Sequence, residues 1–346
     1  MPKIISYAKI LARFAKDGKR GWKSVSWNTF LSKLKRTGPL LPPIHVTIEP
    51  ANLCNIKCPV CETGKGEMTR TAGMMDTTAY RRFVDENWKS LNTMFFYFMG
   101  EPFLHKDAYE MIRYARNKGI NVETCTNGDY MDPQGVIYSD INVVNVQIGG
   151  MDNETHAIYR VGSSLDKVKK NLELLLEERR RYPESNVKII VGFIVMKHNE
   201  HQVEAFKRWG GGGADVAQVI SPCVRTVEEG QKFLPENRDY WIYNEAEFNA
   251  GRLKPLLSPG GKCPWIWNSI VINWNGDAVA CCRDPLGTNV LGNVFEEGLA
   301  RVFNGEKAKA FRKAVMEHQE LLPLCRLCPG EGIPGLYATS FPKIKE

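Results

Sequence analysis

The segment "EPANLCNIKCPVCETG", residues 49–64, places Cys54, Cys58 and Cys61 within eight residues. It continues "IHVTIEP" (44–50), where apolar and polar residues alternate as they do in a β-strand. A loop directly after the first strand of a parallel barrel lies at the carboxyl end of the strands, where the active sites of such folds lie. The sequence therefore predicts a thiol-rich site at that end of a barrel.

Strand and helix patterns alternate over the next 170 or so residues, as βα units require. The expected strands carry few polar residues, which is typical of parallel strands covered by helices. About six such units predict an α/β fold with a partial (βα)6 barrel rather than a closed eight-stranded one. The expected strands are 44–50, 93–100, 121–128, 142–150, 186–196 and 215–220, and the expected helices are 76–91, 107–118, 132–139, a long one capped by Ser163 with Asp166, and 199–209.

Composition indicates a globular chain, with 43% hydrophobic and 25% charged residues among 346. The longest apolar stretches, 94–99 and 189–196, are too short to span a bilayer, and no secretory signal follows the start. We therefore expect a cytoplasmic protein. Without an export signal, the ten cysteines predict metal or redox chemistry rather than disulfides.

The pattern divides the chain into three parts: a basic arm (1–43), the barrel (44–222), and a linker with a small cysteine-bearing domain (223–346). The arm holds ten Lys or Arg and one acid, a net charge of +9, whereas the whole chain is +7. In the last part we expect a hairpin at 269–282, with Asn275-Gly276 supplying the positive φ angles of its turn, and a helix at about 296–318.

Three thiolates can bind three irons of an iron-sulfur cubane and leave the fourth iron without a protein ligand. Zinc would require a further close ligand, for which His45 and His105 are the nearest histidines. A structural role for the cysteines is the other alternative. The spacing favours the cluster.

These residues resemble those of the radical S-adenosylmethionine (SAM) superfamily, over roughly residues 44–330. The matching motifs are the Cys54-x3-Cys58-x2-Cys61 loop, "MGEP" (99–102) after the second strand and "TNG" (126–128) after the third. Tyr159-Arg160, before the long helix, also follows the family's layout.

The resemblance implies that Cys54, Cys58 and Cys61 bind a 4Fe-4S cluster whose open iron chelates SAM. One electron, from a donor such as flavodoxin or ferredoxin, then cleaves SAM to a 5′-deoxyadenosyl radical that abstracts hydrogen from the substrate. It also implies which residues contact SAM: Met99, Gly100, Glu101, Pro102, Asn127 and Gln147. It assigns no catalytic residue.

The chain departs from the family pattern at two places. The residue before the third cysteine is commonly aromatic in the family, but here it is Val60. The fourth strand commonly ends in Ser-hydrophobic-Asp-Gly, whereas this chain reads Gln147-Ile148-Gly149-Gly150. Gln147 either keeps a ribose hydrogen bond or is a polar strand end that faces water.

A second set of cysteines resembles the auxiliary-cluster extension called SPASM or, in its shorter form, twitch. Cys263, twelve residues, Gly276, four residues and Cys281 match its opening, and Cys325-x2-Cys328 supplies two more thiolates for a second 4Fe-4S cluster. Adjacent cysteines on a strand point to opposite faces, so we expect Cys281 rather than Cys282 to be the ligand. Cys125 and Cys223 are expected to be small core residues, although Cys223 could face the substrate.

The leading hypothesis is an oxygen-sensitive radical oxidoreductase acting on a small molecule such as a sugar, cyclitol or lipid-linked sugar, like the twitch-type dehydrogenase of 2-deoxy-scyllo-inosamine. A peptide-modifying enzyme is the alternative, and residues 1–43 are too short for the usual leader-peptide docking module. RNA modification is a further alternative, and no DNA partner is expected. A non-catalytic scaffold would leave "MGEP" and "TNG" unexplained.

The arm raises a separate question. Ile4, Ala8, Leu11 and Ala15 recur at helical spacing among lysines and arginines, and Trp22 and Trp27 follow. Residues 1–36 could therefore contact an anionic membrane peripherally, or pack their apolar side on the barrel and leave the charges in water.

Overall fold

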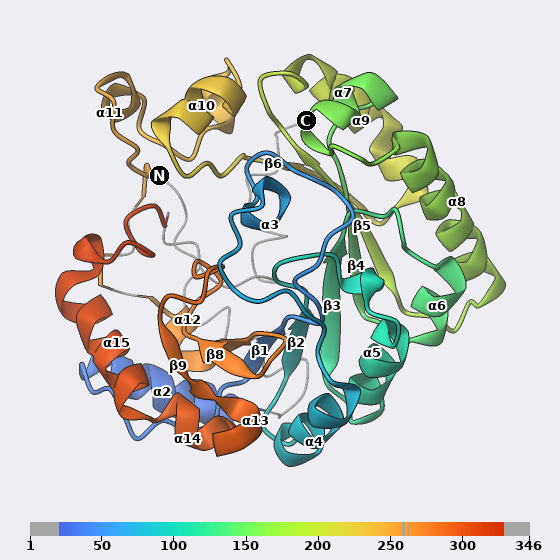
Figure 1. Ribbon diagram of the computed structural model, residues 1–346. Helices are drawn as coiled ribbons and strands as arrows, with labels where there is room; N and C mark the ends of the chain where they lie inside the picture. The colour runs from blue at the N-terminus through green and yellow to red at the C-terminus, as the bar shows by residue number, and fades with distance from the viewer. Residues whose placement is uncertain (1–20, 258–259, 262, 329–346) are drawn as a thin grey trace.

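One curved sheet organises the molecule, as the computed structural model shows for residues 21–257, 260–261 and 263–328 (Figure 1). Its nine strands lie in the order β6-β5-β4-β3-β2-β1-β7-β8-β9. Strands β6 to β1 and β7 run parallel to their neighbours, and β8 and β9 are antiparallel. The strands are β1 (His45–Ile48), β2 (Thr93–Phe96), β3 (Asn121–Thr126), β4 (Val143–Ile148), β5 (Lys188–Ile194), β6 (Val216–Ile220), β7 (Ser269–Ile272), β8 (Asp277–Val279) and β9 (Val290–Asn293).

Helices cover the outer face of the parallel strands, as Figure 1 shows for α4, α5, α6 and α8. The six predicted βα units are confirmed, and the strands form a partial barrel. The helices are α2 (Trp22–Lys33), α3 (Glu62–Lys65), α4 (Thr77–Asn87), α5 (Ala108–Asn117), α6 (Pro133–Tyr138), α7 (Asn153–Tyr159), α8 (Leu165–Arg181), α9 (Val203–Trp209), α10 (Val227–Phe233), α11 (Glu245–Asn249), α12 (Trp265–Asn268), α13 (Val294–Glu297), α14 (Leu299–Phe303) and α15 (Glu306–His318).

The long helix α8 begins one residue later than its sequence predicts. Its N-cap is Ser164, whose hydroxyl accepts from the backbone N–H of Lys167, so the predicted Ser163 cap is wrong. The Ser163 hydroxyl instead donates to Asp129 at 2.9 Å, beside the carboxyl ends of the strands. By contrast, the predicted Asp76 cap of α4 accepts from Ala79 N–H at 2.8 Å.

The hairpin β7–β8 extends the barrel sheet, because β7 pairs with β1 over four residues. Its strands are shorter than predicted, and Gly276 has a φ of 90° while Asn275 does not have a positive φ. The connection is therefore a loop longer than two residues, in which only Gly276 needs a positive φ. The predicted two-residue turn, with positive φ at both Asn275 and Gly276, is wrong. A Cβ at Gly276 would lie 2.4 Å from the Phe295 ring, so the close approach of α13 also requires glycine.

The single helix expected at 296–318 is wrong, because the segment forms α13, α14 and α15. Gly298, at φ 81°, separates α13 from α14, and Asn304 and Gly305 separate α14 from α15. A residue in the left-handed region ends a helix, and glycine adopts that region readily.

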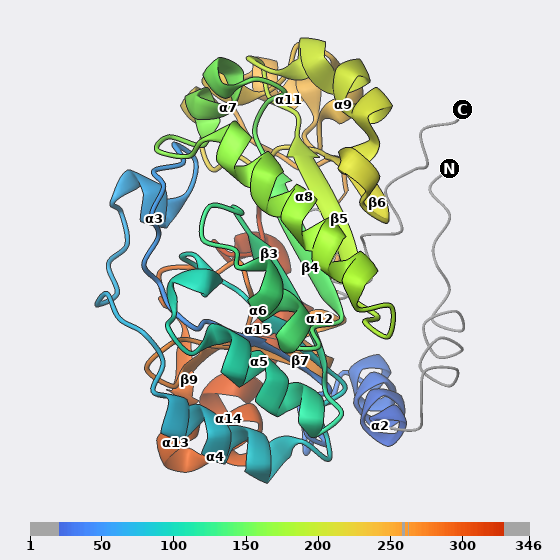
Figure 2. The ribbon, with the colours of Figure 1, turned by 90° about the vertical axis from the view of Figure 1, so that its right-hand side faces the viewer.

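Helix α2 packs at the opposite side of the sheet from α3 (Figure 2). It turns Asn28 inward, where the side-chain amide donates to the carbonyls of Leu41 and Trp267. The helix also buries Ser24, Val25 and Leu31, whereas Trp22, Trp27 and Phe30 remain exposed. The predicted amphipathic helix around Ile4–Ala15 lies outside the described residues.

Candidate active site

A cavity of about 230 Å³ opens at the carboxyl ends of β1 to β4 and gathers most of the predicted site residues. Met99, Pro102 and Val60 do not line it. Its lining consists of Cys54, Ile56, Cys58, Cys61, Gly64, Tyr97, Phe98, Gly100, Glu101, Cys125, Thr126, Asn127, Gln147, Tyr159 and Arg160.

The three-cysteine loop forms one wall of this cavity. Burial raises the pKa of the Cys54 thiol to about 11 and also raises that of Cys58. The Asn127 amide points to the Cys54 sulfur at 3.9 Å, and the Arg160 guanidinium to the Cys58 sulfur at 3.7 Å. These donors favour thiolates, while burial opposes ionisation until a cation arrives.

The donor set fits an iron-sulfur cluster better than a single metal ion. In the described part of the chain, no three His, Cys, Asp or Glu side chains are placed to hold one ion. Thiolates of a cubane bind separate irons, so they need only line a common cavity. His45 packs on the Phe95 ring within the sheet and His105 contacts the Met75 carbonyl, so neither histidine supports the zinc alternative.

Glu101 is a buried carboxylate, 2% exposed, at the floor of the cavity. It accepts from the Thr126 hydroxyl at 2.7 Å and the Asn127 backbone N–H at 2.8 Å, which joins "MGEP" to "TNG". Burial nevertheless raises its pKa to about 7. Among the described residues it forms no ion pair, so an additional hydrogen-bond donor or cation in the cavity would stabilise its ionised form.

Gly100 lets the second-strand motif pack directly on the cysteine loop. Its φ is 80°, and a Cβ there would lie 2.5 Å from the backbone oxygens of Ala51 and Leu53. The next residue, Glu101, donates its backbone N–H to the Leu53 carbonyl at 2.8 Å. The two motifs therefore form a single rigid wall, and glycine is required between them.

A hydrogen-bonded network behind the cavity was not predicted from the sequence. Asn127 donates to Asn55, and Asn55 donates to Asp129, each at 2.8 Å. Asp129 also accepts from Ser163, whose hydroxyl lies 3.0 Å from the His156 ring. The network fixes Asn127 against the cysteine loop. In the sequence, only the "TNG" motif, which contains Asn127, points to this network.

The two departures from the family pattern have different structural consequences. Gln147 lines the cavity and donates to Asn145 on the same strand. A Cβ on Gly192 of β5 would lie 2.2 Å from the Gln147 amide, so this glycine makes room for the glutamine. Val60 is buried with Ile56 and Tyr159 in a small hydrophobic cluster, so it gives no ring to the cavity.

Arg160 lines the cavity, and the sequence predicted no contact for it. Its guanidinium faces Cys58, and its buried Nε has no acceptor among the described residues. A buried donor without a partner is costly, and a ligand oxygen in the cavity would satisfy it.

The second set of cysteines also comes together. Cys263 lies close enough to Cys325 and Cys328 for their charges to raise its pKa, which burial brings to about 12. Cys281 in turn interacts with Cys263 and Cys282. Cys281 and Cys282 lie beyond the end of β8 and contact each other. The prediction that they point to opposite faces of a strand is therefore wrong, and it cannot decide which of the two is the cluster ligand.

The cysteines outside both sets lie at the cavity or near it. Cys125 lines the cavity from β3, so its expected place in the core is wrong. Cys223 follows β6 and contacts the guanidinium groups of Arg225 and Arg283 at 3.3 and 3.2 Å. Cys282 is the most exposed of the three.

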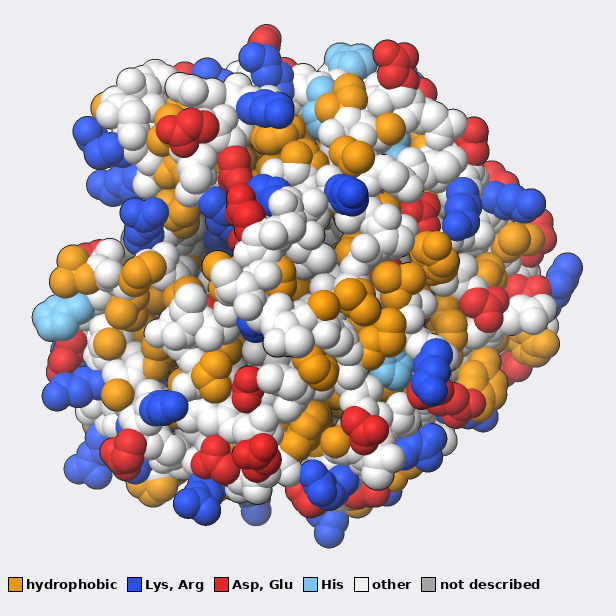
Figure 3. All heavy atoms as spheres, in the orientation of Figure 1, with side chains coloured by type: hydrophobic (Ala, Val, Ile, Leu, Met, Phe, Trp, Pro, Cys, Tyr) orange, Lys and Arg blue, Asp and Glu red, His pale blue; other side chains and the backbone are white. Residues whose placement is uncertain are grey.

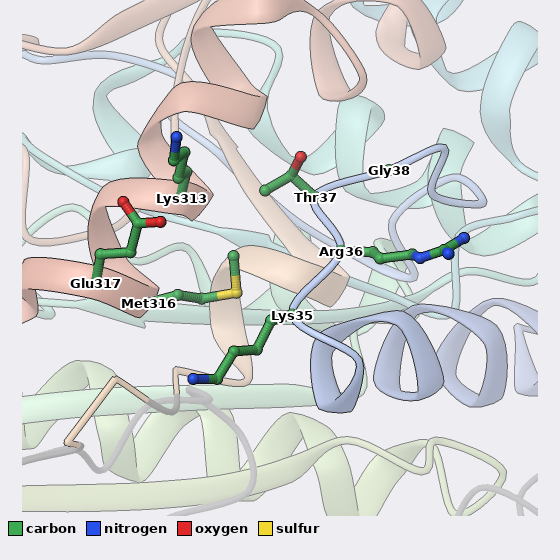
Figure 4. Close-up of a pocket in the computed structure, with 7 residues that line it drawn as sticks. All are labelled: Lys35, Arg36, Thr37, Gly38, Lys313, Met316 and Glu317. Atoms are coloured by element: carbon green, nitrogen blue, oxygen red, sulfur yellow. The ribbon is translucent and has the colours of Figure 1, made fainter.

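A separate cavity of about 420 Å³ lies between α15 and the segment after α2 (Figure 4). Lys35, Lys313 and Glu317 line it, and in Figure 4 Arg36 extends away from Glu317. None of the predicted site residues lines this cavity.

Two family models match the chain over the regions that carry these sites. Residues 48–209 match the radical SAM superfamily, and residues 263–329 match SPASM, an iron-sulfur cluster-binding domain. The chain belongs to the radical SAM superfamily. It is a radical SAM enzyme with a C-terminal SPASM extension, and its cofactors are SAM and 4Fe-4S clusters.

Curated radical SAM relatives align over most of the chain at low identity. The subtilosin biosynthesis protein AlbA of Bacillus subtilis is 22% identical over 327 residues, 86% of this chain and 69% of AlbA. The PqqA peptide cyclase of Xanthomonas campestris is 22% identical over 321 residues, 83% of this chain and 80% of the cyclase. The mycofactocin maturase MftC of Mycobacterium ulcerans is 25% identical over 71% of this chain and 67% of the maturase.

Solved structures share the fold. SuiB of Streptococcus suis bound to SAM has a TM-score of 0.58 at 15% identity, covering 87% of this chain and 75% of SuiB. The enzyme anSMEcpe with bound SAM has a TM-score of 0.57 at 19% identity, and the match covers 83% of this chain and 88% of anSMEcpe. BtrN in complex with SAM and 2-DOIA has a TM-score of 0.51 at 16% identity, and the match covers 82% of this chain and 91% of BtrN.

Among the described residues, no helix is long and apolar enough to span a membrane.

Proposed function

We propose that Cys54, Cys58 and Cys61 hold the 4Fe-4S cluster that reduces SAM, and that Cys263, Cys281, Cys325 and Cys328 hold the auxiliary cluster. The supporting observation is that the three thiols share one cavity with the buried Glu101 and with Asn127. With SAM bound, the cluster supplies one-electron reduction and the radical that abstracts hydrogen from the substrate.

The chain's own residues orient SAM in this proposal. Glu101 accepts hydrogen bonds from the amino group, held in place by Thr126 and the Asn127 backbone. Arg160 donates its free Nε–H to an oxygen of the ligand carboxylate, which offsets the cost of that buried donor. Gln147, which lines the cavity near the end of β4, donates to a ribose hydroxyl in this proposal.

Iron content and SAM cleavage test this assignment together. Anaerobically reconstituted protein should hold about eight irons, as two cubanes require. Changing Cys54, Cys58 and Cys61 together to Ala should remove about half of the iron and all 5′-deoxyadenosine formation. Formation of 5′-deoxyadenosine by the triple variant would refute the assignment.

We propose a peptide as the substrate. The name of the Xanthomonas relative specifies a peptide, and that of the Bacillus relative specifies biosynthesis of a bacteriocin. The small molecule expected from the sequence is the second candidate, and BtrN, which binds 2-DOIA, has the same fold. Incubation with precursor peptides encoded near the gene decides between them: a mass change in a peptide supports the proposal, and modification of a sugar or cyclitol alone would refute it.

We also propose a peripheral contact between α2 and an anionic membrane. Trp22, Trp27 and Phe30 are exposed on this helix beside Lys23 and Lys33, and the sequence from 18 to 48 holds no acid. Aromatic side chains and cations together favour an anionic interface. Because α3 and the cysteine loop lie on the opposite side of the sheet (Figure 2), this orientation suits a substrate that enters from water rather than from the lipid.

A further inference from the structure

Two arginines converge on Cys223 at the carboxyl end of the barrel, outside the SAM cavity. Nη1 of Arg225 lies 3.3 Å and Nη1 of Arg283 3.2 Å from the Cys223 sulfur, and the Tyr243 hydroxyl lies 3.7 Å from it. Arg225 comes from the segment before α10, and Arg283 from the loop after β8. Two segments distant in the sequence therefore bring two positive charges to one point.

The two guanidinium groups are not equally compensated. Nε of Arg225 donates to the Glu62 carboxylate at 3.0 Å. Arg283 forms no ion pair with a carboxylate among the described residues, and its Nη1 donates to the Cys223 sulfur. Arg225 Nη2 and Arg283 Nε and Nη2 donate no hydrogen bond to a described residue, and both arginine side chains are partly exposed, that of Arg225 at 35%. Unused and accessible donors on a rigid fork are suited to a planar or tetrahedral oxyanion.

The site lies between the two cluster-binding regions. Glu62, which anchors Arg225, follows Cys61, and the backbone N–H of Arg283 donates to the Cys281 sulfur at 3.4 Å. On the face that carries these loops, Figure 3 shows a hollow between α10–α11 and α15, with Lys and Arg side chains along it. A substrate held at this point would be within reach of both regions.

We propose that Arg225 and Arg283 form an oxyanion-binding subsite that holds a carboxylate or phosphate group of the substrate beside Cys223. The proposal rests on the function proposed above and names the chemistry of its substrate: an acidic residue or carboxyl terminus of a peptide, or a phosphorylated molecule. Each guanidinium donates one N–H to the sulfur and keeps others for the ligand oxygens. Tyr243, 1% exposed, holds the cysteine backbone through its bonds to Val224.

The experiment measures alkylation of Cys223 by iodoacetamide in the reconstituted full-length enzyme, without oxygen, by peptide mass spectrometry. Sodium acetate, sodium phosphate and sodium chloride are compared at equal ionic strength. An oxyanion bound by the two arginines should slow alkylation of Cys223 relative to chloride by about threefold when present at twice its Kd. Protection by acetate alone indicates a carboxylate substrate, and protection by phosphate alone a phosphorylated one.

Variants separate binding from an effect of salt on the thiol. Arg225→Gln and Arg283→Gln should each abolish the protection of Cys223 from alkylation. Arg252→Gln, which changes an exposed arginine paired with Glu247, should keep it. Equal alkylation rates in the three salts, or protection that survives in both Gln variants, would overturn the proposal. Iron content and 5′-deoxyadenosine formation in the same samples show whether the proposed cluster and SAM sites are intact, so failure of the subsite is distinguishable from failure of the function.

Discussion

At the scale of single residues, Glu101 makes the pH dependence of SAM binding predictable. Burial raises the pKa of this carboxyl to about 7, although Thr126 and Asn127 donate to it. In the proposed site the ionised form accepts hydrogen bonds from the SAM amino group, so below pH 7 the carboxyl must lose its proton before SAM binds. We expect the Kd for SAM to rise as the pH falls below 7, by up to about tenfold per unit. Calorimetric titration from pH 5.5 to 8 measures it.

Glu101→Gln is the control, because the amide keeps an acceptor oxygen but does not titrate. It should bind SAM more weakly at pH 8, lack the part of the pH dependence that belongs to Glu101, and retain its iron. An unchanged pH profile in this variant would remove Glu101 from the binding site.

The adjacent cysteines give a second prediction at this scale. Cys281 interacts with Cys263 and accepts from the Arg283 backbone, whereas Cys282 is exposed. Cys281→Ala should therefore lose the auxiliary cluster and Cys282→Ala keep it. Iron analysis and electron paramagnetic resonance of each variant, with Cys54, Cys58 and Cys61 also changed to Ala, measure this. Loss of the cluster in the Cys282 variant only would show that Cys282 is the ligand.

Individual site residues could be predicted where a short motif carries them. The three cysteines, Glu101 and Asn127 fall in local patterns, and the structure places all five around one cavity. Ser163 and His156 could not be predicted, because their partners lie on other segments and no spacing in the sequence records that contact.

At the scale of elements, apolar runs predicted the six parallel strands, since buried strands need no polar alternation. The helices after β9 were less predictable. Their apolar pattern continues through Gly298 and Gly305, and only the backbone conformation at these residues divides it. The turn at Gly276 likewise depends on the close approach of Phe295, a tertiary contact.

Helix α2 carries a prediction about membranes. Its exposed aromatic residues and the exposed cations Lys23, Lys33, Lys35 and Arg36 should bind vesicles containing anionic lipid, each cation contributing on the order of 1 kcal/mol at low salt. Flotation with vesicles of phosphatidylserine and phosphatidylcholine measures binding, which should fall as salt rises.

A matched pair of variants tests whether α2 is responsible. Phe30 and Tyr182 are similarly exposed, at 51% and 47%, but Tyr182 lies at the end of α8. Phe30→Ser should weaken vesicle binding, and Tyr182→Ser should leave it unchanged. If full-length protein stays unbound at low salt, the membrane proposal is wrong.

At the scale of the whole molecule, the region assigned to SPASM and the barrel share one sheet and one hydrophobic core. Trp265, Trp267 and Ile270 are buried in the same cluster as Val46 and Ile48 of β1. The side chain of Asn28, on α2, donates to the Trp267 carbonyl, which joins α2 to the region assigned to SPASM. The predicted boundary at residue 222 therefore raises the question of whether the barrel folds without the sequence that follows.

We expect that it does not. A chain ending at Leu257 would leave the β1 edge unpaired and would lack buried core residues that include Trp265, Trp267 and Ile270. Burial of each such side chain contributes about 1.5–3 kcal/mol, so their loss is on the scale of a domain's whole stability. It should give no cooperative thermal transition by circular dichroism. The full-length chain with Cys263, Cys281, Cys325 and Cys328 changed to Ala should keep a cooperative transition. The shared sheet and core, not the auxiliary cluster, join the barrel to the region assigned to SPASM. A shortened chain that melts at the same temperature as the full-length protein would show that the barrel folds without the sequence after Leu257.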